Sequence, residues 1–284
     1  MDNTNRLLND VEETDKGGTS RDMTTVLTIA GSDCSGGAGI QADLKTMTVL
    51  GAYGMSVITA LTAQNTMGVS GVFEVTPEFV GQQLDSVFQD IFPDAVKIGM
   101  VSNLDIVRVI TRKLKGYSAR HIVVDPVMIS TSGSSLIDRE AIAAMTTELF
   151  PLAEVVTPNL FEAEVLSGIT IINKADMEKA AEAILKYGSA SVLVKGGHMD
   201  GKAEDYLLTA DGGFWFSSER LDNHNTHGTG CTLSSAIATN LANGDDIHGA
   251  VETAKHYVTG AIADGLDLGH GRGPLNHMYT LKQS

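Results

Sequence analysis

The chain has 284 residues, of which 43% are hydrophobic, enough for a sizeable buried core. Its 20 basic residues stand against 35 acidic ones, and this net charge of −15 argues against non-specific nucleic-acid binding, which needs clustered Lys and Arg. No apolar run reaches the length of a membrane span, and two cysteines do not make a disulfide framework. We therefore expect no nucleic-acid or membrane partner and a reducing, cytoplasmic location.

The first 22 residues are polar and contain no hydrophobic signal core. We interpret residues 1–22 as a flexible leader. We expect residues 23–284 to form a single domain, because no linker or internal repeat interrupts them.

Short apolar runs alternate with helical patterns along most of the chain. The predicted strands are residues 25–30, 56–63, 95–98, 121–125, 154–157 and 191–195, followed by a hairpin of 205–209 and 213–217. The predicted helices are residues 42–50, a helix opened by Thr76 and Pro77, residues 177–185 and a buried helix after Cys231. This order predicts an α/β fold with a mostly parallel sheet covered on both faces. Ligands bind beyond the carboxyl ends of the strands in such sheets.

The turn at residues 227–231, His-Gly-Thr-Gly-Cys, is the strongest functional signal. Gly228 and Gly230, placed just before a helix, let successive backbone N–H groups point at one anion. Cys231 would then lie near a helix N-terminus, where thiol pKa values fall, so we expect a pKa near ~7 and a general-base role. The plainer interpretations are an ordinary glycine turn and a buried structural cysteine.

A second glycine-rich segment, residues 31–43, follows the first predicted strand. Its Gly37-Ala-Gly39-Ile-Gln-Ala42 matches a dinucleotide fingerprint, but the strand ends too early and no ribose-binding acid follows the next one. It is not a Walker A loop either, so close backbone approach to a small substrate is the better interpretation. Asp43 either hydrogen-bonds a polar substrate or serves its own helix.

Two carboxylates follow other predicted strands. Asp125 precedes Pro126, and Glu162 follows Asn159 by three residues. Both are hard oxygen donors suited to Mg²⁺, partly through waters, as nucleotide phosphates require. A strand-end turn and a helix cap are the alternatives.

Two lysines are candidate phosphate ligands. Lys255 lies beside the apolar stripe of a helix, where a snorkelling stem is the usual explanation. Lys195 closes a strand before two glycines. His224 and His227 lie in a loop without a third ligand, so we interpret them as loop histidines rather than a metal site.

Taken together, these segments resemble the ribokinase-like kinases, and among them the hydroxymethylpyrimidine/phosphomethylpyrimidine kinases of thiamine biosynthesis. The segments that carry the resemblance are LTIAGSDCSGGAGIQADLKT (27–46), ITALTAQN (58–65), KIGM (97–100), DPVM (125–128), TPNLFEA (157–163) and the turn at 227–231. The resemblance covers nearly the whole chain outside the leader.

The resemblance implies a three-layer α/β/α sandwich, usually dimeric. It also implies an enzyme that phosphorylates a pyrimidine alcohol and then its monophosphate with ATP and Mg²⁺. It places Gln64 on the pyrimidine edge, with Asp43, Gly31, Ala38, Met100 and Val127 around the same pocket. Gly228 and Gly230 would form the anion hole beside the catalytic Cys231. Asn159, Thr229, Lys195 and Lys255 would lie on the nucleotide side, with Asp125 and Glu162 near the metal.

Two rival functions remain at this stage. A pyridoxine or pyridoxal kinase would share the fold and the anion turn, and Gln64 is the residue expected to discriminate the two rings. A non-catalytic pyrimidine or nucleotide sensor is the rival from another class, and the intact base, turn and metal motif argue against it.

Overall fold

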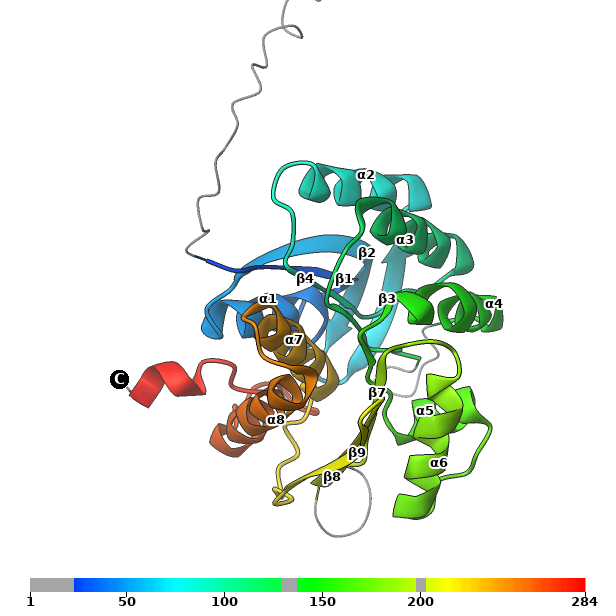
Figure 1. Ribbon diagram of the computed structural model, residues 1–284. Coiled ribbons are helices and arrows are strands. Elements are labelled where there is room, and N and C mark those ends of the chain that lie inside the picture. The colour runs from blue at the N-terminus through cyan, green and yellow to red at the C-terminus, as the bar shows by residue number, and fades with distance from the viewer. Residues whose placement is uncertain (1–22, 129–136, 198–202, 284) are drawn as a thin grey trace, which may run out of the picture.

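The computed structural model describes residues 23–128, 137–197 and 203–283, so the predicted leader at 1–22 lies outside the described residues. A nine-stranded sheet forms its centre, in the order β3-β2-β1-β4-β5-β6-β7-β8-β9 (Figure 1). The strands are β1 (Thr25–Asp33), β2 (Tyr53–Asn65), β3 (Gly68–Glu74), β4 (Ala95–Ile98), β5 (Ile122–Val124), β6 (Val155–Val156), β7 (Ser191–Lys195), β8 (Ala203–Thr209) and β9 (Gly212–Ser218).

The sheet is parallel through its middle. Neighbours from β2 to β7 run parallel, whereas β3 pairs antiparallel with β2, and β8 and β9 extend the other edge as an antiparallel hairpin. The predicted mostly parallel sheet and the predicted hairpin are therefore confirmed.

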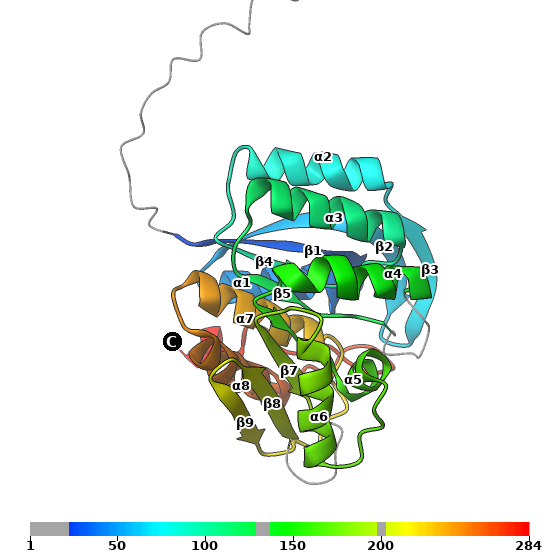
Figure 2. The same cartoon turned by 45° about the vertical axis from the view of Figure 1, so that its right-hand side comes forward.

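Helices cover both faces of this sheet (Figures 1 and 2). One face packs against α2 (Pro77–Phe88), α3 (Leu104–Tyr117), α4 (Arg139–Ala144), α5 (Leu160–Ser167) and α6 (Lys174–Leu185). The other face packs against α1 (Gly39–Val49), α7 (Thr229–Ala242) and α8 (Ile247–Asp264). Short π or 3₁₀ turns occur at Met145–Leu149, Phe150–Leu152 and Tyr279–Gln283. The expected three-layer α/β/α arrangement is confirmed.

In the central strand β4, successive side chains point alternately into the two hydrophobic cores on either side of the sheet. Val96 and Ile98 belong to the core under α2 and α3, while Ala95 belongs to the core under α7 and α8. Side chains alternate between the two faces of a strand, so Lys97 falls on the α7 side. It is completely buried there, which is unusual for a lysine.

Local capping signals set several helix boundaries. The Thr76 hydroxyl accepts a hydrogen bond from Phe79 N, with Pro77 at the first helical position, as predicted. At α5, Asn159 and Glu162 form a reciprocal capping box. This local chemistry explains why the predicted start of α2 was accurate.

Three elements were not among the predicted ones: β3, α3 and α4. β3 contains Gly68 and Gly71 and leaves Val72 and Phe73 exposed, so it lacks the apolar alternation of a half-buried strand. α3 was missed although Asn103 caps it through a hydrogen bond from Ile106 N. β2 is longer than the predicted residues 56–63, because pairing with β1 extends it back to Tyr53 and pairing with β3 extends it to Asn65.

Candidate active site

A cavity of about 550 Å³ opens at the carboxyl ends of the parallel strands. Fourteen of the fifteen predicted site residues line it, namely Gly31, Ala38, Gln64, Met100, Asp125, Val127, Asn159, Glu162, Lys195, Gly228, Thr229, Gly230, Cys231 and Lys255. Their positions agree with the prediction that the caps of successive strands gather on one rim, while their individual roles remain predictions.

The anion turn lies at the N-terminus of α7. Gly228 is the N-cap residue and adopts a left-handed conformation with φ 84°. A Cβ at this position would collide with the carbonyl oxygen of Gly37 in the first glycine-rich segment, so glycine is required on two grounds. The first N–H groups of α7 have no partner within the helix and sit at the wall of the cavity. This arrangement favours an anionic ligand.

The expected low pKa of Cys231 is wrong. Burial raises the pKa of the Cys231 thiol to about 11, against the opposing influence of Lys97 and of the Gly39 N–H. The carboxylates of Asp43 and Asp125 add to the rise. A position at a helix N-terminus favours a lower thiol pKa, but the effect of burial on the Cys231 pKa is larger.

Asp125, Lys195 and Glu162 form a buried charged cluster on the cavity wall. Lys195 Nζ lies 2.7 Å from Asp125 Oδ1 at the end of β7. Ser234 from α7 and Thr157 after β6 also contact the Asp125 carboxylate. Asp125, directly after β5, thus contacts the residue after β6, the last residue of β7 and the second turn of α7.

Glu162 combines a capping role with a perturbed charge. Its Oε2 accepts a hydrogen bond from Asn159 N at 2.8 Å, so the helix-cap alternative is confirmed for this residue. Burial raises the pKa of Glu162 to about 7, although Lys195 opposes the rise. A cation bound nearby would relieve this cost, which fits a metal-binding role alongside the cap.

No group of three or more His, Cys, Asp or Glu side chains among the described residues could hold a metal ion by itself. Two carboxylates on a wall beside an anion turn suit an ion whose remaining ligands are waters and phosphate oxygens, which is how Mg²⁺ binds with nucleotides. The donor set of Asp125 and Glu162 therefore fits Mg²⁺ bound together with a nucleotide.

Lys255 is held by an ion pair rather than by a snorkelling stem alone. Its Nζ lies 2.6 Å from Asp205 Oδ2, and Asp205 also accepts a hydrogen bond from Gly196 N. Lys255 of α8 and Asp205 of β8 thus line one edge of the cavity.

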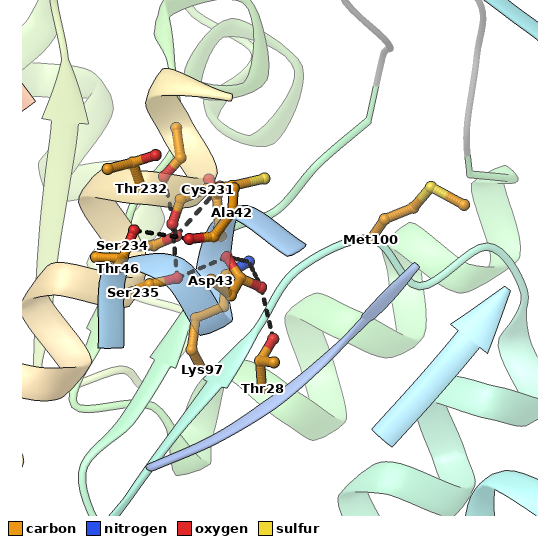
Figure 3. A network of polar contacts seen from close by, with 12 residues as sticks. Thr28, Ala42, Asp43, Thr46, Lys97, Met100, Cys231, Thr232, Ser234 and Ser235 are labelled. Carbon is orange, nitrogen blue, oxygen red and sulfur yellow. Dashed lines mark hydrogen bonds and ion pairs between the residues drawn. The ribbon is translucent and has the colours of Figure 1, made fainter. Parts of the chain in front are cut away.

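Asp43 is the exception among the predicted site residues, and its proposed contact with substrate is wrong. Its side chain is completely buried and does not line the cavity. Both carboxylate oxygens accept hydrogen bonds within the protein, from Lys97 at 2.8 and 2.9 Å, Thr28 at 2.6 Å and Ser235 at 2.6 Å (Figure 3). The alternative, that Asp43 caps or solvates its own helix, is wrong as well, because Asp43 is buried and its partners lie on β1, β4 and α7.

Two lining residues were missed, Asp33 and His227. His227 Nε2 lies 2.9 Å from Asp33 Oδ2 and 3.3 Å from the Gln64 amide nitrogen, and it is buried. His227 was interpreted as a loop histidine because sequence proximity to His224 suggested only a metal site. An Asp directly before a glycine-rich turn was the available signal for Asp33, since Asp commonly accepts hydrogen bonds from turn amides.

Comparison with known proteins identifies the family. The phosphomethylpyrimidine kinase family model matches residues 33–276. The chain belongs to this family. It is 49% identical over 256 residues to the hydroxymethylpyrimidine/phosphomethylpyrimidine kinase of Streptomyces coelicolor, covering 90% of this chain and 95% of that protein.

A bifunctional relative is similar over only part of its length. The thiamine biosynthesis bifunctional protein ThiED of Geobacter sulfurreducens is 52% identical over 257 residues, which are 90% of this chain but 52% of that protein. The chain therefore spans about half of this relative, and the match concerns that part alone.

Solved structures agree with the family and with the ribokinase-like fold. A phosphomethylpyrimidine kinase from Clostridium difficile superimposes with a TM-score of 0.76 at 49% identity, covering 84% of this chain and 99% of that one. The pyridoxal kinase of Staphylococcus aureus in complex with AMP-PCP and pyridoxal superimposes with a TM-score of 0.83 at 37% identity, covering 90% of this chain and 93% of that one.

Among the described residues, none of the helices is both long and apolar enough to cross a membrane.

Proposed function

We propose that the protein transfers the γ-phosphoryl group of ATP to the hydroxymethyl group of 4-amino-5-hydroxymethyl-2-methylpyrimidine, and then phosphorylates the resulting monophosphate to the diphosphate. The observation that carries the proposal is that one cavity holds Gln64, the Gly228–Gly230 turn and Cys231 together. A ring-reading amide, an anion cradle and a proton acceptor are the parts that this reaction requires.

On the substrate side, the Gln64 amide can both donate to and accept from an aminopyrimidine edge. Gly31 and Ala38 permit close approach of the ring, since neither projects a large side chain. Met100 and Val127 supply apolar contact from the ends of neighbouring strands. The Met100 sulfur and methyl lie against Gly31, so the methionine fills the space beside this glycine.

On the nucleotide side, Lys195, Lys255, Asn159 and Thr229 line the same cavity. Asp125 and Glu162 would hold Mg²⁺, which when bound neutralises charge on the phosphate oxygens. Both lysines are already paired with carboxylates, so their ammonium groups are fixed in place before the nucleotide arrives. Such preorganisation lowers the cost of binding a charged ligand.

In the transfer step, the substrate hydroxyl oxygen forms a bond to the γ-phosphorus and the bond to the β–γ bridging oxygen breaks. ADP leaves, and the hydroxyl proton passes to the Cys231 thiolate. The raised pKa of Cys231 keeps most of it as thiol at neutral pH, so the rate rises with pH as the thiolate fraction grows. The N–H groups of α7 stabilise charge on the transferring group, a contribution of about 3–4 kcal/mol for a single donor in comparable sites.

The direct test is a steady-state assay with ATP and three acceptors side by side: hydroxymethylpyrimidine, its monophosphate and pyridoxal. We expect kcat/KM for the two pyrimidines to exceed that for pyridoxal, and Gln64→Leu to lower pyrimidine use selectively. A higher value for pyridoxal would make the protein a pyridoxal kinase, and no ATP turnover with any acceptor would make it a sensor. Cys231→Ser should flatten the rise of kcat between pH 7 and pH 9, and an unchanged profile would remove Cys231 from the base role.

We further propose that the protein acts in the cytoplasm as a homodimer formed through the β2–β3 edge of the sheet. Four apolar side chains are exposed here: Leu61 of β2 (47%), Met67 in the turn between the strands (66%), and Val72 (48%) and Phe73 (70%) of β3. Apolar side chains this exposed on one edge are typical of an interface. Sedimentation equilibrium should give a dimer, and Phe73→Ser should shift it toward monomer; a monomeric wild type would contradict the proposal.

A further inference from the structure

A lysine is fully buried on the α7 side of the sheet and does not line the cavity. Lys97 is 0% exposed, and its ammonium lies 2.8 and 2.9 Å from the two oxygens of Asp43. Although burial opposes its charged form, the carboxylate of Asp43 raises the pKa of Lys97 above its ordinary value, so the ammonium stays charged. A buried ion pair is costly to maintain, and replacing one by apolar residues often leaves stability unchanged. Stability is therefore a weak explanation for keeping it here.

The pair is connected directly to the first turns of α7 (Figure 3). Ser235 Oγ lies 2.6 Å from Asp43 Oδ1 and 2.7 Å from the carbonyl oxygen of Cys231. A hydroxyl has one proton, so Ser235 donates to one of these acceptors at a time, and a carboxylate is the stronger one. The carboxylate thus ties β4, through Lys97, to the helix that carries Cys231.

The backbone around Lys97 is adapted to this placement. A Cβ at Gly99 would come within 2.7 Å of Lys97 Nζ, so the glycine two residues later leaves the ammonium its space. Thr28 from β1 fixes the other side of the carboxylate with a hydrogen bond of 2.6 Å. Four segments therefore hold one positive charge in a single position.

The charges that face Cys231 come from four directions. They are Lys97 on β4, Asp43 on α1, Asp125 after β5 and Lys195 at the end of β7. Lys97 is the strongest of the influences that favour the Cys231 thiolate, while Asp43 and Asp125 oppose it.

We propose that Lys97 is a positioning residue for phosphoryl transfer, a fixed positive charge beneath the first turn of α7 that favours the Cys231 thiolate and an anion at the Gly228–Gly230 turn. Asp43 holds this charge in place and keeps it protonated. The inference deepens the proposed function and rests on its assignment of Cys231 as the proton acceptor.

The test compares two substitutions that alter the same network, only one of which changes its charge. Lys97→Met removes the positive charge and should raise the pKa of the Cys231 thiol by about 1–3 units. Ser235→Ala breaks the tie between Asp43 and α7 without removing a charge and should leave the thiol pKa close to that of the wild type. The shift is read from the rate of iodoacetamide alkylation at fixed pH, which falls about tenfold for each unit by which the thiol pKa rises, with the Cys231 peptide quantified by mass spectrometry. A merely structural tie predicts the same change in both variants, and that outcome would overturn the proposal.

A matched control is available on the opposite face of the sheet. Lys113 of α3 forms an ion pair with Asp85 of α2 at 2.6 Å, and Lys113→Met should leave the alkylation profile of Cys231 unchanged. If Lys97→Met does not fold because it strands the Asp43 carboxylate, Lys97→Met/Asp43→Leu takes its place. The thiol pKa of the double variant should remain above that of the wild type, because Lys97 influences Cys231 more than Asp43 does. A pKa at or below the wild-type value would contradict the inference.

The readout is separate from the proposed function. A thiol pKa raised in Lys97→Met alone, in a protein that does not phosphorylate hydroxymethylpyrimidine, would show that the Lys97 charge acts on Cys231 and that the proposed function is wrong. Normal pyrimidine kinase activity in the wild type, with an unchanged thiol pKa in Lys97→Met, would support the proposed function and contradict the inference about Lys97.

Discussion

His227 Nε2 lies 2.9 Å from Asp33 Oδ2, and this contact joins the two glycine-rich segments that are 194 residues apart. The Asp33 carboxylate also accepts hydrogen bonds from the backbone of Ser35, Gly37 and Ala38. One side chain thus shapes the first glycine-rich segment and fixes it to the anion turn. The Gln64 amide nitrogen lies 3.3 Å from the same His227 nitrogen, so the residue proposed to read the ring packs against this contact.

Asp33→Asn should lower stability in a pH-dependent way. Burial works against the Asp33 carboxylate, but hydrogen bonds from His227, Ser35 and Ala38 lower its pKa from 3.8 to about 2. A carboxylate with a depressed pKa stabilises the fold above its unfolded pKa, here by about 2 kcal/mol, and the contribution is lost as pH falls from about 4 to 2. Urea unfolding should show a smaller difference in the free energy of unfolding between wild type and variant at pH 3 than at pH 7. Asp211→Asn, in the exposed hairpin turn, is the control and should behave as wild type.

Gly228→Ala should damage both the fold and the turn. The left-handed φ costs an alanine about 1–2 kcal/mol, and the added Cβ would collide with Gly37 O, moving the amides that cradle the anion. Gly244→Ala is a matched control after the same helix, with φ 100° and open space around the Cβ. Both variants should lose stability by urea unfolding, but only Gly228→Ala should lose about 100-fold or more in kcat. Equal kcat values for the two would show that the turn does not act in transfer.

Glu162→Gln should raise the Mg²⁺ concentration needed for half-maximal activity by about 10–100-fold, as loss of an outer-shell carboxylate does elsewhere. Gln can preserve the capping box at the start of α5, so the change isolates the charge. Glu164→Gln, two residues later in the same helix, should leave the Mg²⁺ titration unchanged. The titration measures initial rates at saturating ATP, and an unshifted midpoint in Glu162→Gln would exclude a metal role.

Lys255→Met should raise KM for ATP by about tenfold or more, because a charge-assisted hydrogen bond contributes about 1.5–3 kcal/mol. KM for the pyrimidine should change little, since Lys255 pairs with Asp205 at the edge formed by β8 and α8. Lys179→Met, an exposed lysine of α6, serves as the control. An increase confined to the pyrimidine KM would place Lys255 on the substrate side instead.

Much of the fold could be predicted from sequence because its strands are buried on both faces and its glycine turns follow them directly. β4 and β7 match their predicted residues, since each is a short run rich in β-branched residues and is followed directly by glycine. The exposed edge strand β3 escaped prediction because its side chains are not sorted into a buried and a solvent face. The position of β3 is set by its pairing with β2, and the local sequence of β3 does not encode that pairing.

The location of the site could be predicted from the sequence better than the charge states of its residues. Motifs at strand ends indicated the cavity wall, since parallel strands bring their carboxyl ends together. The pKa of Cys231 and the role of Asp43 depend on burial and on Lys97, which lies 54 positions from Asp43 and 134 from Cys231 in the chain. Electrostatic neighbours of this kind come from tertiary packing, and local spacing holds no signal for them.

The placement of Lys97 on β4 has a consequence for hydrogen exchange. β4 lies between β1 and β5, so its backbone amides are shielded by neighbours on both sides and by helices on both faces. Exchange there requires large-scale opening of the sheet. We therefore expect the Lys97 amide to exchange more slowly than the amides of the exposed hairpin turn at Asp211. The Lys97 charge thus stays in one place during local openings elsewhere in the protein.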